Sequence, residues 1–190
     1  MNEKALNQSD KKISSDEYSR GGDRNKPAAN RWHNLIGANI TVATGSRLQG
    51  HKCEIYVNDM RVQMKNNRIC YPDVVIVNTE PVFTDQNFDV LLNPTVVVEI
   101  FSTSTNSSNK TNKLENYLAM DSIRECLLVK EDEMRVEHYA KQNAKQWIYR
   151  IYNERDDVIS LESINIKLSL AEIYAQIKFR QAEISSGAVN

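Results

Sequence analysis

Long apolar runs, cysteine pairs and zinc-type motifs are all missing from this sequence of 190 residues. No stretch approaches the roughly 18 consecutive apolar residues that a membrane-spanning helix requires. No apolar segment follows the basic residues near the N-terminus, so we expect no secretory signal and a soluble, cytoplasmic protein. The three cysteines form no CxxC pair, and the three histidines lie far apart without zinc-ligand spacing. The cysteines are therefore predicted to be reduced thiols in the core.

An excess of charge of one sign is missing as well. The 24 basic side chains nearly cancel the 25 acidic side chains, which leaves a formal net charge of −1. A chain with balanced charge has no overall field that predicts nucleic-acid binding, so any contact with DNA must come from a local patch. A hydrophobic content of 41% and a length of 190 residues fit a single folded domain.

The apolar pattern divides the chain at residue 30. Residues 1–29 show no sustained apolar periodicity and are predicted to be an N-terminal tail, largely irregular. Residues 30–190 are predicted to form the domain. From Asn30 onward, apolar residues recur at steps of three and four, which predicts an amphipathic helix that ends between Gly45 and Gly50.

The remaining pattern predicts a central sheet. Alternating apolar residues over 53–64 predict a half-buried strand, with a break at 58–59. Apolar runs at 74–77 and 95–101 predict strands that are covered on both faces. The pattern continues with a helix through about Met120, a strand at 125–129, a hairpin of 134–139 with 147–152, and a closing helix capped by Ser169. This order of elements predicts an α/β fold.

Two acidic residues lie where acids are costly. Glu99 lies inside the apolar run TVVVEIF, and burying an ionised carboxylate without a partner costs several kcal/mol or more. Asp73 follows Pro72 directly before another apolar strand. Two acids on neighbouring strands can converge on one hard divalent ion, which takes oxygen ligands and retains waters. Two other interpretations stay open, because Asp73 can belong to a turn and Glu99 can protrude into solvent or pair with a lysine.

The stretch from about Asn30 to Ile177 carries several motifs in a fixed order. They are HNLIGANI from His33, YPDVVIV from Tyr71, NPTVVVEIFSTST, NKTNKLENYLAMDSIRECLLV, VEHY and SLAEIY. This series resembles the Uma family of endonucleases (DUF820-type) in the PD-(D/E)xK nuclease superfamily. The resemblance implies an α/β domain with a restriction-endonuclease-like mixed central sheet flanked by helices. It also implies a divalent-metal-dependent endonuclease that hydrolyses DNA phosphodiester bonds.

The resemblance implies roles for three residues. Asp73 and Glu99 correspond to the acids that bind Mg²⁺ or Mn²⁺, with a metal-bound water as the nucleophile. The superfamily lysine usually lies two residues after the second acid, where this chain has Phe101. The Uma pattern carries a lysine on the following helix instead, which falls on Lys113, where it would stabilise phosphate charge or orient water. A solvated helix lysine is the alternative interpretation of Lys113. His33 matches a helix histidine of the family and either contacts the site or has a structural role.

Departures from the family pattern keep other functions open. Asn109 replaces an aspartate and Thr103 replaces a proline. No residue between Tyr18 and His33 matches a glutamate of the family's N-terminal hairpin. If the missing glutamate leaves metal binding incomplete, the chain would be a catalytically impaired nuclease-fold protein that acts as a nucleic-acid or protein interaction module. A structural, oligomer-forming protein without a ligand is a third hypothesis.

The expected partner is DNA rather than a membrane, and a homodimer is expected by analogy with enzymes that cut two strands.

Overall fold

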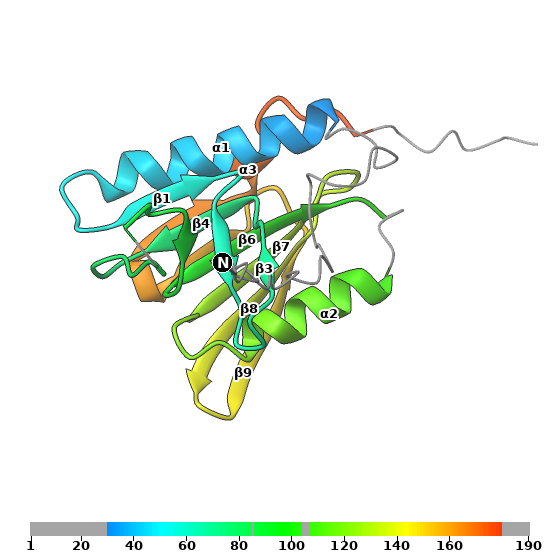
Figure 1. Ribbon diagram of the computed structural model, residues 1–190. Helices are drawn as coiled ribbons and strands as arrows, with labels where there is room; N and C mark the ends of the chain where they lie inside the picture. The colour runs from blue at the N-terminus through cyan, green and yellow to red at the C-terminus, as the bar shows by residue number, and fades with distance from the viewer. Residues whose placement is uncertain (1–29, 85, 104–106, 180–190) are drawn as a thin grey trace, which may run out of the picture.

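A computed structural model describes residues 30–84, 86–103 and 107–179 of the chain (Figure 1). The segment expected to be an N-terminal tail, residues 1–29, lies outside the described residues, so the boundary at residue 30 stays a prediction. Among the described residues, no helix is long and apolar enough to cross a lipid bilayer.

The centre of the fold is a six-stranded mixed sheet in the order β1-β4-β6-β7-β8-β9. Its β6 and β7 strands are parallel, and all other neighbours in it are antiparallel. The bounds are β1 (Glu54–Val57), β4 (Val74–Val77), β6 (Val96–Phe101), β7 (Glu125–Lys130), β8 (Val136–Asn143) and β9 (Gln146–Tyr152). The expected strands at 74–77 and 95–101 are therefore confirmed as neighbours in the middle of the sheet.

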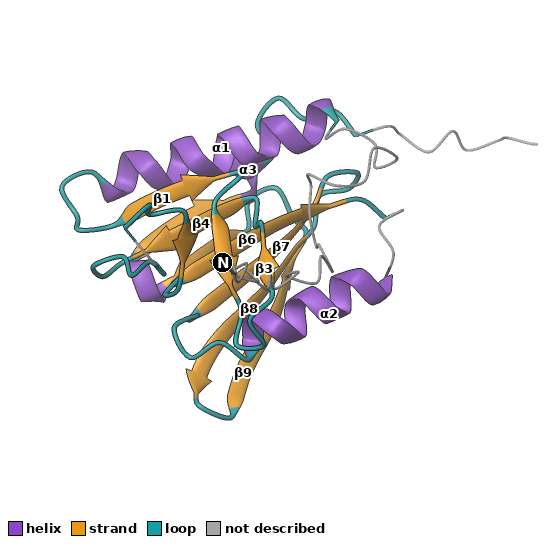
Figure 2. Cartoon of the chain, in the orientation of Figure 1, coloured by secondary structure: helices purple, strands orange, loops and turns teal. Residues whose placement is uncertain are grey.

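A helix covers each face of this sheet, as Figure 2 shows. On one face lies α1 (Arg31–Leu48), together with α3 (Leu170–Ile173) and the hairpin of β10 (Val158–Leu161) and β11 (Ile166–Ser169), which are joined by the short helix η1 (Glu162–Ile164). On the other face lies α2 (Ser107–Leu118). Because side chains alternate along a strand, β4 and β6 contribute to two hydrophobic cores, one on each face. Both faces of these strands are buried, as the apolar runs predicted.

The ends of the helices follow local sequence signals. Asn30 caps α1, because its side-chain oxygen accepts hydrogen bonds from the backbone N–H groups of Trp32 and His33. Ser169 caps α3 in a reciprocal arrangement with Glu172, as expected. The closing helix is shorter than its apolar pattern suggested, since α3 ends at Ile173 and the left-handed conformation of Gln176 (φ 64°) turns the chain away.

A second small sheet was not expected from the sequence. The predicted strand over 53–64 breaks at Asn58, which adopts a left-handed conformation (φ 60°), as the polar pair at 58–59 suggested. After the break the chain leaves the main sheet and forms a three-stranded sheet in the order β3-β2-β5. Its strands are β2 (Arg61–Gln63), β3 (Ile69–Cys70) and β5 (Val90–Leu91). Two-residue strands such as β5 carry too little alternation to be recognised in a sequence.

Candidate active site

Asp73 and Glu99 lie at one end of the central sheet. Asp73 directly precedes β4, Glu99 lies near the end of β6, and the antiparallel register pairs Val74 with Val98. The two acids are therefore brought to the same end of neighbouring strands. Both are enclosed, with Asp73 4% exposed and Glu99 9% exposed to solvent. The backbone N–H of Ile100, the residue after Glu99, donates a hydrogen bond of 2.7 Å to Oδ2 of Asp73.

The other carboxylate oxygen of Asp73 contacts the first helix. Oδ1 of Asp73 lies 3.0 Å from Nε2 of His33 on α1. The second ring nitrogen of His33, Nδ1, lies 3.3 Å from Oε2 of Glu131. His33 therefore sits between two carboxylates, one in front of β4 and one directly after β7. The sequence left open whether His33 contacts the site, and the structure places it in contact with Asp73.

Glu131 is held in this position from two sides. Its Oε1 accepts a hydrogen bond of 2.7 Å from Nδ2 of Asn30, and its backbone N–H donates to the carbonyl of Phe101 at 3.0 Å. The amide of Asn30 thus caps α1 with its oxygen and orients Glu131 with its nitrogen. The start of α1, the end of β6 and the end of β7 are joined by this network of hydrogen bonds.

Glu99 is partnered by α2 on the opposite face. The ammonium of Lys113 lies 2.8 Å from Oε1 and 2.7 Å from Oε2 of Glu99. The hydroxyl of Tyr117, one helical turn later, donates to Oε1 at 2.5 Å. Lys113 is therefore not a solvated helix lysine, because its charged end faces Glu99. The sequence also left open that Glu99 pairs with a lysine, and the contact with Lys113 is such a pair.

Burial and the contact between Glu99 and Lys113 shift the pKa value of each of these two residues in opposite directions. Burial raises the pKa of Glu99, the charge of Asp73 raises it further, and Lys113 lowers it without cancelling the effect of burial. Burial alone would lower the pKa of Lys113, but Glu99 and Asp73 outweigh it and the pKa is raised. Lys113 therefore stays protonated beside two carboxylates, and the site combines negative and positive charge in an enclosed space.

Two residues of this site were not assigned to it from the sequence. Tyr117 received no role in the site from the sequence, and its ring is buried in the core while its hydroxyl reaches Glu99. Glu131 was not considered at all. Glu131 lies at the same end of the sheet as Glu99 because it directly follows β7, which is parallel to β6, and this pairing is visible only in the structure.

The described residues contain no group of three or more His, Cys, Asp and Glu side chains arranged to hold a metal ion. The donors that are present are two carboxylates, and a hard divalent ion such as Mg²⁺ is typically bound by one or two carboxylates while it keeps several waters. The chemistry of the donor set therefore fits a single ion. In the structure, Lys113 and Tyr117 occupy the oxygens of Glu99 that such an ion would share.

Comparison with solved structures identifies the fold. A crystal structure titled as a "putative nuclease belonging to DUF820" from Anabaena variabilis ATCC 29413 superposes with a TM-score of 0.67. The match covers 83% of this chain and 88% of that chain at 18% sequence identity. The mixed central sheet flanked by helices is thus the restriction-endonuclease-like architecture that the motifs implied.

Comparison of sequences gives two relatives, both from Synechocystis sp. (strain ATCC 27184 / PCC 6803 / Kazusa). The protein sll1609 is 32% identical over 117 residues, which are 61% of this chain and 66% of sll1609, so the match spans slightly less than two thirds of that relative. The protein slr1290 is 27% identical over 161 residues, which are 84% of this chain and 79% of slr1290. The family model Uma2, described as "Putative restriction endonuclease", matches residues 7–172. Because this match spans far more than half of the chain, the protein belongs to the Uma2 family.

Proposed function

We propose that this protein is a divalent-metal-dependent endonuclease that hydrolyses phosphodiester bonds in DNA. The observation that carries the proposal is the position of Lys113, whose ammonium contacts both oxygens of Glu99 beside Asp73. Burying charged groups costs free energy of folding, and a cluster of titratable groups with shifted pKa values is typical of catalytic sites. Membership of the Uma2 family and the nuclease-like fold support the same function.

Each residue has a distinct role in this proposal. Asp73 and Glu99 hold one Mg²⁺ or Mn²⁺ ion, which would polarise the phosphate and activate a water molecule when bound. Lys113 stabilises the negative charge that develops on the phosphate, because an ammonium on a flexible stem is a mobile point charge. His33 positions Asp73 through its contact of 3.0 Å, and the N–H of Ile100 fixes the second oxygen of that carboxylate.

Nicking of supercoiled plasmid DNA tests the proposal. The wild-type protein is expected to nick the plasmid when Mg²⁺ or Mn²⁺ is supplied and to be inactive in EDTA. Asp73→Asn keeps the size of the side chain but removes its charge, so cleavage should be abolished. Asp59→Asn is the matched control, because Asp59 is exposed in the turn between β1 and β2. Equal rates for wild type and Asp73→Asn would refute the assignment of Asp73.

Metal binding provides an independent measurement. A ligand that binds only the folded state raises the melting temperature, so Mn²⁺ should stabilise the wild type and not Asp73→Asn. If the wild type shows neither cleavage nor stabilisation by metal, the proposal of an enzyme fails. Binding of DNA with a steep dependence on salt would then identify a catalytically impaired interaction module, since phosphate contacts release counterions.

Two finer points rest on the same proposal. A cytoplasmic location is proposed because the described chain holds free thiols, two of them, Cys70 and Cys126, buried. A homodimer is proposed because cutting both strands of a duplex requires two active sites or two successive events. Size-exclusion chromatography with light scattering measures the mass of the species in solution and decides the second point.

A further inference from the structure

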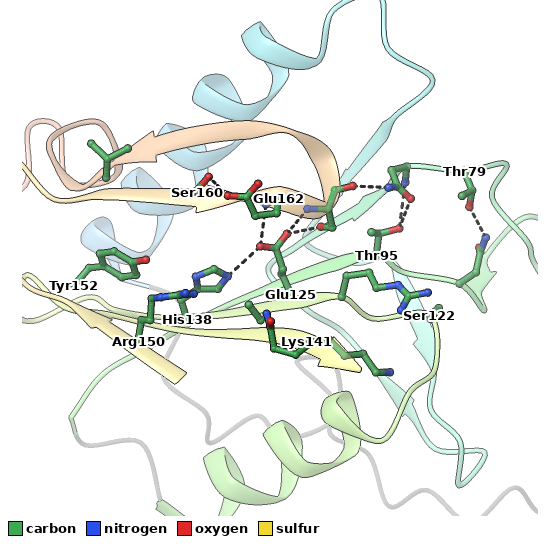
Figure 3. A pocket seen from close by; sticks show the side chains of 17 residues that line it. Thr79, Thr95, Ser122, Glu125, His138, Lys141, Arg150, Tyr152, Ser160 and Glu162 are labelled. Atoms are coloured by element: carbon green, nitrogen blue, oxygen red, sulfur yellow. Dashed lines mark hydrogen bonds and ion pairs between the residues drawn. The ribbon is translucent and has the colours of Figure 1, made fainter. Parts of the chain in front are cut away.

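A cavity lies at the end of the central sheet that is opposite to the candidate active site. It has a volume of about 850 Å³ and is lined by residues of the loops before β6 and β7, by β8 and β9, and by the β10–β11 hairpin (Figure 3). Glu125 at the start of β7 lines it, whereas Glu131 of the candidate active site follows the end of the same strand. Six residues of strand separate the two, which is roughly 20 Å. The cavity is therefore separate from the site around Asp73 and Glu99.

The walls of this cavity carry three cationic side chains. Arg124, Lys141 and Arg150 all line it, and neither arginine forms an ion pair with any residue that the structure describes. The ammonium of Lys141 donates to the backbone carbonyls of Met120 and Asp121, at 3.1 and 3.4 Å. Burial lowers the pKa of Lys141 and the charge of Arg124 lowers it further, while the charge of Asp121 acts in the opposite direction. The ammonium of Lys141 is thus already engaged, whereas the two guanidinium groups favour the binding of an anion.

Two acids, Glu125 and Glu162, also line the cavity, and an oxygen of Glu162 accepts a hydrogen bond of 2.6 Å from the hydroxyl of Ser160. Glu125 is 2% exposed and its carboxylate is satisfied by His138, by the hydroxyl and N–H of Ser163 and by the N–H of Glu162. Burial would raise the pKa of Glu125, but the hydrogen bonds from His138 and Ser163 outweigh burial and the pKa is lowered. Glu125 thus acts as a structural carboxylate that organises the floor of the cavity and has no free oxygen for a cation.

Two buried polar atoms in the cavity wall lack a partner. Nδ1 of His138 and Oγ of Ser122 form no hydrogen bond with any described residue, although both are enclosed. His138 is 1% exposed, and its other ring nitrogen contacts Oε1 of Glu125 at 3.2 Å. An enclosed polar atom without a partner is costly, so buried polar groups are usually satisfied by protein, water or ligand. Figure 3 shows His138 beside Arg150 and Tyr152 on the wall formed by β8 and β9.

We infer that this cavity is a binding site for a small phosphorylated ligand of nucleotide size, held by Arg124 and Arg150. Guanidinium groups match phosphate oxygens with two parallel hydrogen bonds, and a pair of arginines suits a diphosphate or triphosphate better than a single carboxylate. A volume of about 850 Å³ lies in the range of pockets for such ligands. This inference does not depend on the proposed nuclease activity.

Isothermal titration calorimetry on the full chain tests the inference with pyrophosphate and ATP as probes, in EDTA so that no divalent ion bridges the phosphates. Saturable binding is expected. Arg124→Gln and Arg150→Gln should each weaken it about tenfold or more, since each removes a charge-assisted hydrogen-bond donor. Both arginines are exposed, so neither change should impair folding. Arg155→Gln is the matched control, because Arg155 is an exposed arginine that does not line the cavity.

The outcomes separate this cavity from the other anion-binding candidates. Lys113→Met, shown by circular dichroism to be folded at the temperature of the titration, should still bind pyrophosphate; loss of binding in this folded variant with unchanged binding in Arg150→Gln would place the anion beside Lys113 and overturn the inference. Absence of saturable binding, or equal affinity in Arg150→Gln and Arg155→Gln, would also overturn it. Tighter binding of citrate than of either phosphate probe would refute the inference that the ligand is phosphorylated. If a short DNA duplex binds in a manner that depends on Arg150 while the small probes do not bind, the inference that the ligand is of nucleotide size is refuted.

Discussion

Replacing Lys113 by methionine removes the cation that neutralises Glu99 while keeping most of the aliphatic stem. Both charged groups are largely enclosed, because only 24% of the side-chain surface of Lys113 and 12% of that of Glu99 is exposed. Breaking a buried ion pair by removing one partner costs about 3–5 kcal/mol, and the remaining exposure of Lys113 favours the lower end, about 3 kcal/mol. For a chain of this size, that loss lowers the melting temperature by about 6–12 °C. Lys52→Met, at an exposed lysine, is the matched control.

The dependence of this loss on pH gives a sharper test. Burial raises the pKa of Glu99, so above the ordinary pKa of a carboxyl the folded state binds more protons than the unfolded state. Stability contributed by this group therefore falls as pH rises through that range. Removing Lys113 takes away the main influence that lowers the pKa, so the loss in Lys113→Met should be larger at pH 8 than at pH 5.

Urea unfolding followed by circular dichroism at both pH values measures the effect. The double variant Lys113→Met/Glu99→Gln should recover much of the lost stability, because it removes the unpaired charge as well as its partner. A loss below about 0.5 kcal/mol for Lys113→Met would mean that the contact behaves as an ordinary surface ion pair. A loss that grows as pH falls would refute the assignment of a raised pKa to Glu99.

Two further changes probe the neighbours of the acids. Tyr117→Phe keeps the buried ring and removes the hydroxyl that donates to Glu99, so urea unfolding should show a loss of about 1.5–3 kcal/mol, and an unchanged stability would contradict this hydrogen bond. Glu131→Ala removes the contact that orients His33 toward Asp73, so calorimetry should show Mn²⁺ affinity reduced about 10-fold or more, while Glu133→Ala, at an exposed neighbour, should leave it unchanged.

Much of the fold could be predicted because its signals are local and repeated. The steps of three and four from Asn30 mark α1, and the runs VVIV and VVVEIF mark strands buried on both faces. The split of the predicted strand at Asn58 was also visible, because a polar pair interrupts the alternation. The small sheet could not be predicted, since the parallel pairing of β2 with β5 joins segments of two and three residues that are far apart in the chain.

The candidate site shows where local signals end. Asp73 and Glu99 were recognisable because each is an acid next to or inside an apolar strand. Lys113 was assigned from the family resemblance, and its distance to Glu99 follows only from the packing of α2 on the sheet. Glu131 carries no such mark, because an acid after a strand is ordinary turn composition. Its proximity to His33 depends on the parallel pairing of β6 and β7, a contact between distant segments that no local pattern encodes.

That parallel pair also explains how one sheet can hold two separate charged regions. The register from Val96–Glu125 to Phe101–Lys130 is continuous, so the ends of both strands lie level at each end of the sheet. Glu99 and Glu131 are consequently grouped at one end, and Thr95 and Glu125 at the other. The strands between them are filled by apolar residues that are almost completely enclosed. Each cluster therefore draws its rigidity from the same buried strands, while the apolar centre keeps the charges of the two ends apart.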